Sequence, residues 1–79
     1  MRLDKYLKVS RLIKRRTVAN EACDAGRVMI NDRPAKASAD VKAGDKITIS
    51  FGNKDVSVEV LSVQETVRKE EAKEMCRYL

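Results

Sequence analysis

Residues 14–26 read KRRTVANEACDAG, and this stretch predicts a short helix that follows directly on three cations. Thr17 is a residue type favoured at the N-cap of a helix, and Gly26 is typical of the position after a helix C-terminus. The first N–H groups of such a helix have no partner inside it, and its N-terminus carries partial positive charge. The stretch therefore predicts a phosphate site. A solvated basic corner that binds nothing specific is an equal alternative from this stretch alone.

The cations of the chain are concentrated in its amino-terminal half. The net charge is +5, from 17 Lys/Arg and 12 Asp/Glu in 79 residues. Residues 1–36 contain ten Lys/Arg and four Asp/Glu, whereas residues 37–79 contain seven and eight. Such asymmetry indicates a polyanionic partner, either nucleic acid or an anionic membrane surface. The length predicts a single domain, 1–79, with a thin core.

A helical period runs from residue 3 to about residue 13 and predicts a first helix that ends near Ser10. Its apolar face holds Leu3, Tyr6, Leu7, Ser10 and Ile13, and its polar face holds Asp4, Lys5, Lys8 and Arg11. Because the core needs this apolar face, we expect no membrane binding through it.

Short strands are predicted after the second helix. Residues 27–31 alternate as a strand does, residues 31–34 predict a turn, and residues 35–37 return as an edge strand. Within the second helix, Cys23 is expected to be a small core residue.

The second half of the chain predicts a hairpin and a helix. Ile47, Ile49 and Phe51 alternate as the buried face of a strand, and Gly52-Asn53 is a two-residue hairpin signal. The returning strand is expected to contain a bulge or twist near Val60. Residues 66–79 predict an amphipathic C-terminal helix.

The residues of common catalytic sites are missing. The chain has no histidine, and its two cysteines are too few and too isolated for a metal site or a disulfide framework. No glycine-rich phosphate loop, signal peptide or membrane-spanning stretch is present in the sequence. We therefore expect a cytoplasmic protein that is not an enzyme, with no catalytic residue, metal or cofactor.

Four segments in order resemble the S4-type RNA-binding domain, over about residues 2–50. They are RLDKYL at 2–7, RRTVA at 15–19, GRVMIN at 26–31 and VKAGDKI at 41–47. The resemblance implies an α+β, S4-like αL-motif fold. In it, two N-terminal helices pack on a small, mostly antiparallel sheet, with a hairpin extension at 46–63 and a C-terminal helix at about 66–79.

Within the S4-type proteins, the chain is most similar to the short ribosome-associated heat-shock proteins and, more closely, to the RqcP family of ribosome-associated quality-control factors. This resemblance implies a monomer that binds rRNA and tRNA on large ribosomal subunits carrying obstructed peptidyl-tRNA. It also implies support of C-terminal tailing of stalled nascent chains, alongside a separate tRNA-recruiting factor. The basic C-terminal extension of the heat-shock branch is not matched, because residues 65–79 hold four cations and four anions.

The predicted RNA-binding residues come from the resemblance and from charge. The resemblance places Arg2, Lys14, Arg15, Arg16 and Thr17 in the principal contact segment, and Arg27 and Asn31 on a flanking strand. Charge adds Lys5, Lys8, Arg11, Arg33 and Lys36, which are expected to form one positive surface with Lys14–Arg16 and Arg27. The resemblance also implies burial of Leu3, Leu7, Val18, Ala22, Val28 and Ile30.

Several alternatives remain open at this point. The chain could be a general structured-RNA-binding or protein-interaction module of a ribosome assembly or stress factor, docking through residues 56–63 or the last helix. It could also be the RNA-binding part of a modifying enzyme. Charge alone does not distinguish structured RNA from duplex DNA.

Overall fold

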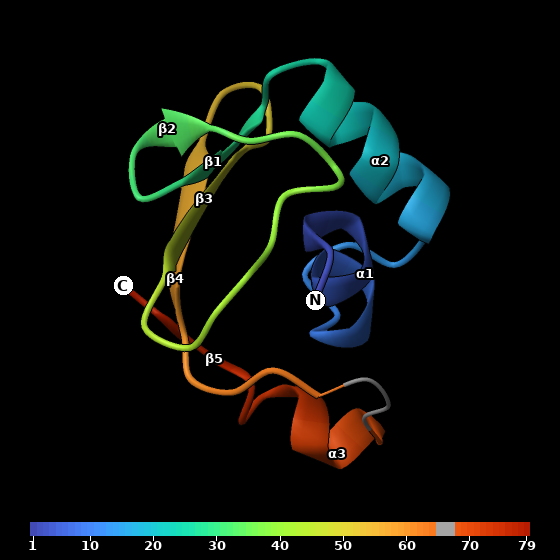
Figure 1. Ribbon diagram of the computed structural model, residues 1–79, viewed down its shortest axis with the longest axis vertical. Helices are drawn as coiled ribbons and strands as arrows, with labels where there is room; N and C mark the ends of the chain where they lie inside the picture. Colours follow the sequence, from blue (N-terminus) through green and yellow to red (C-terminus); the bar gives the residue numbers. More distant parts are fainter. Residues whose placement is uncertain (65–67) are drawn as a thin grey trace.

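Two helices lie on one face of an antiparallel sheet (Figure 1). The computed structural model describes residues 1–64 and 68–79. Within these residues, the helices are α1 (Leu3–Val9), α2 (Arg16–Asp24) and α3 (Lys69–Ala72). The sheet order β2-β1-β3-β4-β5, antiparallel throughout, is formed by β1 (Val28–Ile30), β2 (Arg33–Pro34), β3 (Lys46–Ser50), β4 (Asp55–Val60) and β5 (Cys76–Tyr78). The predicted α+β fold with two amino-terminal helices on an antiparallel sheet is confirmed.

The core lies between α1, α2 and the sheet. Every residue of the predicted apolar face of α1 is buried, and Tyr6 is fully so. From the sheet, Val28, Ile47 and Val58 close the core against these side chains. Cys23 is buried in the same core, as predicted. One assignment to the polar face is wrong, because Asp4 is only 3% exposed.

The turn after β1 forms where the sequence predicts it. Asn31 and Asp32 both have positive φ, +53° and +66°, which suits a two-residue hairpin turn. Because the turn is this short, Arg33 pairs with Ile30 at once. The returning edge strand is therefore β2 at Arg33–Pro34, and its prediction at residues 35–37 is wrong.

The β3–β4 hairpin turns at Gly52-Asn53, as predicted. The Phe51 N–H donates a hydrogen bond to the Lys54 carbonyl at 2.8 Å, and Gly52 has φ +76°. Phe51 itself lies beyond the end of β3 and is 44% exposed, so its predicted burial is wrong.

A bulge lies opposite Val60, on the strand that faces it. The Val60 carbonyl accepts from the Gly44 N–H at 2.8 Å, and the Val60 N–H donates to the Asp45 carbonyl at 2.8 Å. Gly44 and Asp45 thus face the single residue Val60, and Gly44, in the first position of the bulge, has φ +95°. This is the hydrogen-bonding pattern of a bulge led by a glycine, and it lies near Val60 but on the facing segment, not in the returning strand where it was expected.

The C-terminal segment differs from the predicted helix at 66–79. Helix α3 covers only four residues, and residues 76–78 form β5 along the edge of β4. The first residues of the predicted helix, 66 and 67, lie outside the described residues. The Met75 carbonyl accepts hydrogen bonds from the Tyr6 hydroxyl at 2.8 Å and the Leu61 N–H at 2.7 Å. Pairing with β4 and the bond to α1 thus override a weak helical period.

Candidate nucleic-acid interface

Asp4 is a buried carboxylate that joins the starts of the two N-terminal helices. Its Oδ1 accepts hydrogen bonds from Arg2 Nε at 3.2 Å and from the Lys5 backbone N–H at 2.8 Å. Its Oδ2 accepts from Arg16 Nε at 3.3 Å and from Asn20 Nδ2 at 3.4 Å. Because Arg16 and Asn20 lie in the first turns of α2, one carboxylate fixes α2 against α1.

These donors keep Asp4 ionised. Burial by itself raises the pKa of Asp4, but the hydrogen bonds from Arg16, Asn20 and Lys5 and the charge of Arg16 outweigh it and lower that pKa below its ordinary value of 3.8. The side chains of Arg2 and Arg16 are 52% and 45% exposed. Each guanidinium has five N–H donors, so a contact with Asp4 leaves others for a phosphate.

Helix α2 begins before Thr17. Its N-cap is Arg15, at φ −120° and ψ 136°, and the Arg15 carbonyl accepts the N–H of Ala19 at 3.0 Å. Thr17 is the second residue inside the helix, so its prediction as the N-cap is wrong. The contact of Arg16 with Asp4 accounts for this start, because it fixes Arg16 in the first turn. No side chain of the described residues caps the first N–H groups of α2.

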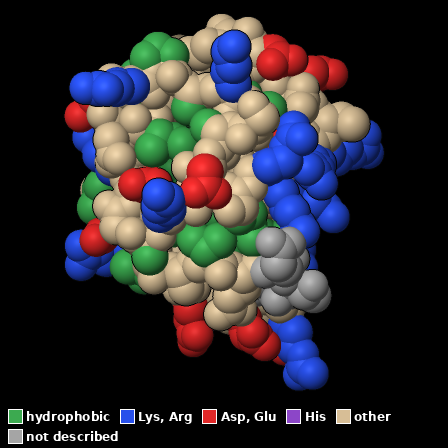
Figure 2. Space-filling view, in the orientation of Figure 1, with side chains coloured by type: hydrophobic (Ala, Val, Ile, Leu, Met, Phe, Trp, Pro, Cys, Tyr) green, Lys and Arg blue, Asp and Glu red, His purple; other side chains and the backbone are tan. Residues whose placement is uncertain are grey.

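The predicted principal contact segment is assembled on one surface. Figure 2 shows Lys and Arg side chains gathered at the right of the molecule, over the start of α2 and beside α1. Lys14, Arg15, Arg16 and Thr17 are all exposed, and Arg2 meets Arg16 at Asp4. We call Arg2 and Lys14–Thr17 the α2-start surface.

The other predicted cations in and next to the helices do not all lie on this surface. Lys8 is exposed in the last turn of α1, and Lys5 is half-buried one turn earlier. Arg27 lines a groove together with Lys14. Arg11, with φ +63°, instead lines a pocket with Lys73 and Tyr78 of the C-terminal segment.

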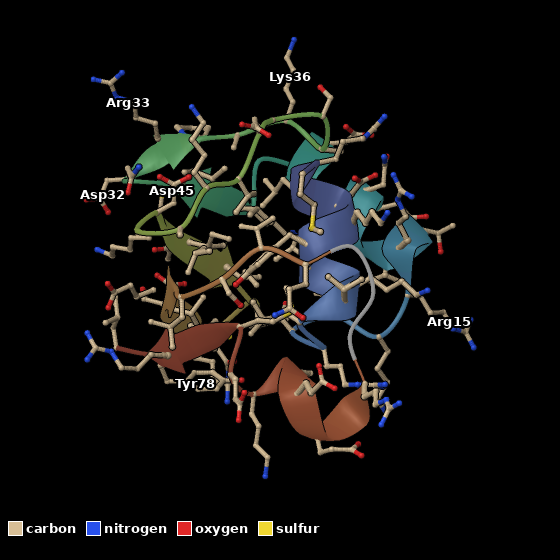
Figure 3. All side chains as sticks on the ribbon, turned by 60° about the horizontal axis from the view of Figure 1, so that its bottom comes forward. Arg15, Asp32, Arg33, Lys36, Asp45 and Tyr78 are labelled. Atoms are coloured by element: carbon tan, nitrogen blue, oxygen red, sulfur yellow. The ribbon has the colours of Figure 1, made fainter. Side chains whose placement is uncertain are left out.

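Arg33 is not brought to the α2-start surface. In Figure 3, Arg33 points outward at the β2 side of the molecule, far across the view from Arg15, whereas Lys36 points outward above the loop whose Ala37 carbonyl accepts the Asp4 N–H. The expectation that Arg33 joins one continuous surface with Lys14–Arg16 is therefore wrong, and for Lys36 it stays a prediction. Asn31 has a structural part in the same region, because its side-chain amide donates to Asp45 Oδ1 at 3.2 Å and its Oδ1 accepts the Lys46 N–H at 3.0 Å.

Sequence reasoning missed Asp4 and Asn20 as members of this site. The sequence contained a signal for Asp4, because residues 2–16 hold seven cations and Asp4 is the single anion in that stretch. Val18 was predicted to be buried, but it is 47% exposed. The buried residues of α2 are instead Ala19 and Cys23, each one position beyond the predicted Val18 and Ala22.

Among residues 1–64 and 68–79, no group of three or more His, Cys, Asp or Glu side chains is placed to hold a metal ion. Over the same residues, no helix has the length and apolar character needed to cross a bilayer. The backbone of β4 is paired with β3 along its length and with β5 at residues 58–60, which leaves no open strand edge over those three residues for a docking partner.

Comparison with known proteins identifies the class first. Residues 1–47 match the family model described as the S4 domain. A solved trimeric structure of heat shock protein 15 from Vibrio cholerae superimposes with a TM-score of 0.92 at 30% identity, covering 100% of this chain and 81% of that one. The fold and the α2-start surface thus define an S4-domain protein.

Two curated relatives narrow the assignment. The RQC P-site tRNA stabilizing factor of Halalkalibacterium halodurans is 62% identical over 72 residues, 91% of this chain and 82% of that protein. The factor with the same name from Bacillus subtilis is 60% identical over 75 residues, 95% of this chain and 87% of that protein. The chain belongs to the family of RQC P-site tRNA stabilizing factors, which confirms the resemblance to the RqcP family.

Proposed function

We propose that the chain is a non-catalytic RNA-binding factor that acts with tRNA in ribosome-associated quality control. It binds rRNA and tRNA on large ribosomal subunits that carry obstructed peptidyl-tRNA, and it acts there as a monomer in the cytoplasm. The names of relatives at 62% and 60% identity support this role, since both are described as stabilizing P-site tRNA in this process.

The finer part of the proposal concerns the nascent chain. By holding the tRNA in place, the protein supports C-terminal tailing of the stalled chain, and a separate factor recruits the incoming tRNA. This division of work fits a small chain whose described residues include no arrangement for metal chemistry. Its contribution is then to bind and to orient RNA.

The observation that carries the proposal is the pair of arginines held by Asp4. Arg2 and Arg16 are half-exposed yet fixed by a buried carboxylate, and Lys14 and Arg15 stand directly before α2. Cations on rigid helices suit a folded RNA, whose backbone is recognised by its shape. Arginine also forms bidentate contacts with phosphate, which favours it over lysine for this purpose.

The test is sedimentation of the protein with purified large subunits, with and without peptidyl-tRNA. Arg15→Ala is the informative variant, because Arg15 is exposed and makes no side-chain cap bond to α2. Lys42→Ala is its matched control, an exposed cation outside the predicted set. We expect association to be strongest with peptidyl-tRNA, reduced several-fold by Arg15→Ala and unchanged by Lys42→Ala. Equal binding to any structured RNA would instead support a general RNA-binding module.

A further inference from the structure

A groove runs between α2 and the end of β3. Its rim contains Lys14 and Arg27, its wall on the helix side contains Val18, and Ser50 and Phe51 lie on the side of the sheet. The volume of this α2–β3 groove is about 300 Å³. Lys14 also belongs to the α2-start surface, so the groove continues from that surface.

The groove exposes two large apolar side chains that sequence analysis placed in the core. Val18 is 47% exposed and Phe51 is 44% exposed, and both line the groove. Buried Ile13 and Ile49 line it as well. Apolar walls with a few polar groups at the rim are the usual composition of a small-ligand site.

The charges at the rim indicate what this ligand is. Of the described residues that line the groove, two are cations, Lys14 and Arg27, and none is acidic. An anionic group at the rim with a flat apolar group between the walls is the chemistry of a nucleotide. The Phe51 ring adds a face on which one base can stack, and the Ser50 hydroxyl can donate to or accept from the edge of that base.

We propose that the α2–β3 groove binds a single unpaired nucleotide of the bound RNA. Its base lies against Phe51 and Val18, and its phosphate lies between Lys14 and Arg27. The proposal rests on the proposed function, because the RNA strand held at the α2-start surface brings the nucleotide to the groove. It adds an element of recognition that contacts with the phosphate backbone do not supply.

Two RNA hairpins test the proposal. They share one stem and differ at one bulged position, which is a uridine in the first and an abasic residue in the second. Because the backbones are alike, the ratio of the two Kd values reports the base alone. We expect the uridine hairpin to bind about tenfold more tightly, in line with the stacking of one base on an aromatic ring. A bulged 5-iodouridine should crosslink to Phe51 under ultraviolet light.

Variants separate the groove from the α2-start surface. Phe51→Ala should remove the preference for uridine and leave the Kd of the abasic hairpin within about twofold, because one stacked base accounts for the difference. Arg15→Ala should weaken binding of both hairpins by the same factor. Thermal unfolding of the free variants checks the fold, and the comparison of the two hairpins on the wild-type protein stands without any variant.

The possible failures are distinguishable. Equal binding of both hairpins by the wild-type protein would overturn the nucleotide site and leave the proposed function in place. That result, together with crosslinking of the groove to an acidic peptide, would assign the groove to a protein partner. Failure of both hairpins to bind at low salt would overturn the proposed function and the nucleotide site together.

Discussion

Two groups of cations in this molecule carry similar charge but are held very differently. The anchored group, Arg2 and Arg16, contacts a carboxylate that is 3% exposed. The edge group, Arg33 and Lys36, projects into solvent from β2 and from the loop that follows it (Figure 3). A cation that is already held in place loses less side-chain entropy when it binds a phosphate. From this comparison we expect placement, more than the number of charges, to decide where RNA binds.

The largest expected effect comes from Asp4→Asn. The ion pairs with Arg2 and Arg16 become hydrogen bonds from a guanidinium to a neutral amide oxygen, and the amide nitrogen cannot accept a bond from either arginine. We expect the free energy of unfolding to fall by about 2 kcal/mol. We also expect affinity for tRNA to fall about tenfold, or 1.4 kcal/mol, although the net charge rises by one. Urea unfolding and fluorescence anisotropy measure the two effects.

Asp32→Asn is the matched control for this variant. It makes the same change of charge at an exposed carboxylate, whose side chain is 73% exposed and pairs with Lys46 at 3.3 Å. Such surface pairs contribute roughly 0–1 kcal/mol, so stability and tRNA affinity should stay near their wild-type values. If Asp4→Asn bound tRNA more tightly than the wild-type protein, net charge rather than placement would determine affinity.

A second expected effect is the dependence of stability on pH. The pKa of Asp4 is lower in the folded protein than its ordinary value of 3.8, so its contribution is complete above that value and is lost as the pH falls through the folded-state pKa. The pKa of Asp40 is also lowered, by a hydrogen bond from the N-terminal ammonium group. Asp4→Asn should therefore reduce, without abolishing, the loss of unfolding free energy between pH 6 and pH 3. An unchanged loss would show that Asp4 is not stabilised in its ionised form.

A smaller effect separates the α2-start surface from the edge group. Arg15→Ala and Arg33→Ala each remove one exposed cation from the predicted set. We expect Arg15→Ala to weaken tRNA binding about fivefold and Arg33→Ala less than about twofold, with the salt slope falling by roughly 1 only for Arg15→Ala. Equal losses would mean that RNA reaches both sides of the molecule.

The smallest effect is expected at Thr17. Because Thr17 is inside α2 and does not cap it, Thr17→Ala should change the free energy of unfolding by less than about 0.5 kcal/mol. An N-cap threonine would instead cost about 1 kcal/mol on replacement by alanine. Thermal unfolding of the variant distinguishes the two positions.

The sequence predicts those parts of the fold that local patterns determine. The apolar period of α1, the Asn31-Asp32 turn and the Gly52-Asn53 hairpin all depend on residues close together in the chain. The exposed cations of Lys14–Arg16 could be predicted for the same reason, since they are adjacent to the helix that displays them.

Other features depend on contacts between distant segments. The burial of Asp4 requires Arg16 and Asn20, which come from another helix. The strand β5 requires the free edge of β4, and the Tyr6 hydroxyl fixes its approach through Met75. The separation of Arg33 from Arg15 follows from the order of strands in the sheet. The spacing of apolar and polar residues within one segment does not predict these contacts between segments.

The salt dependence of tRNA binding tests the central claim most directly. If the fixed cations of the α2-start surface and its neighbours neutralise five or six phosphates, a plot of log Kobs against log salt concentration should have a slope of roughly −4 to −5. The wild-type protein measured between low and physiological salt should give this slope. A slope shallower than about −2 would contradict the account, because the cations would then contribute little to RNA binding.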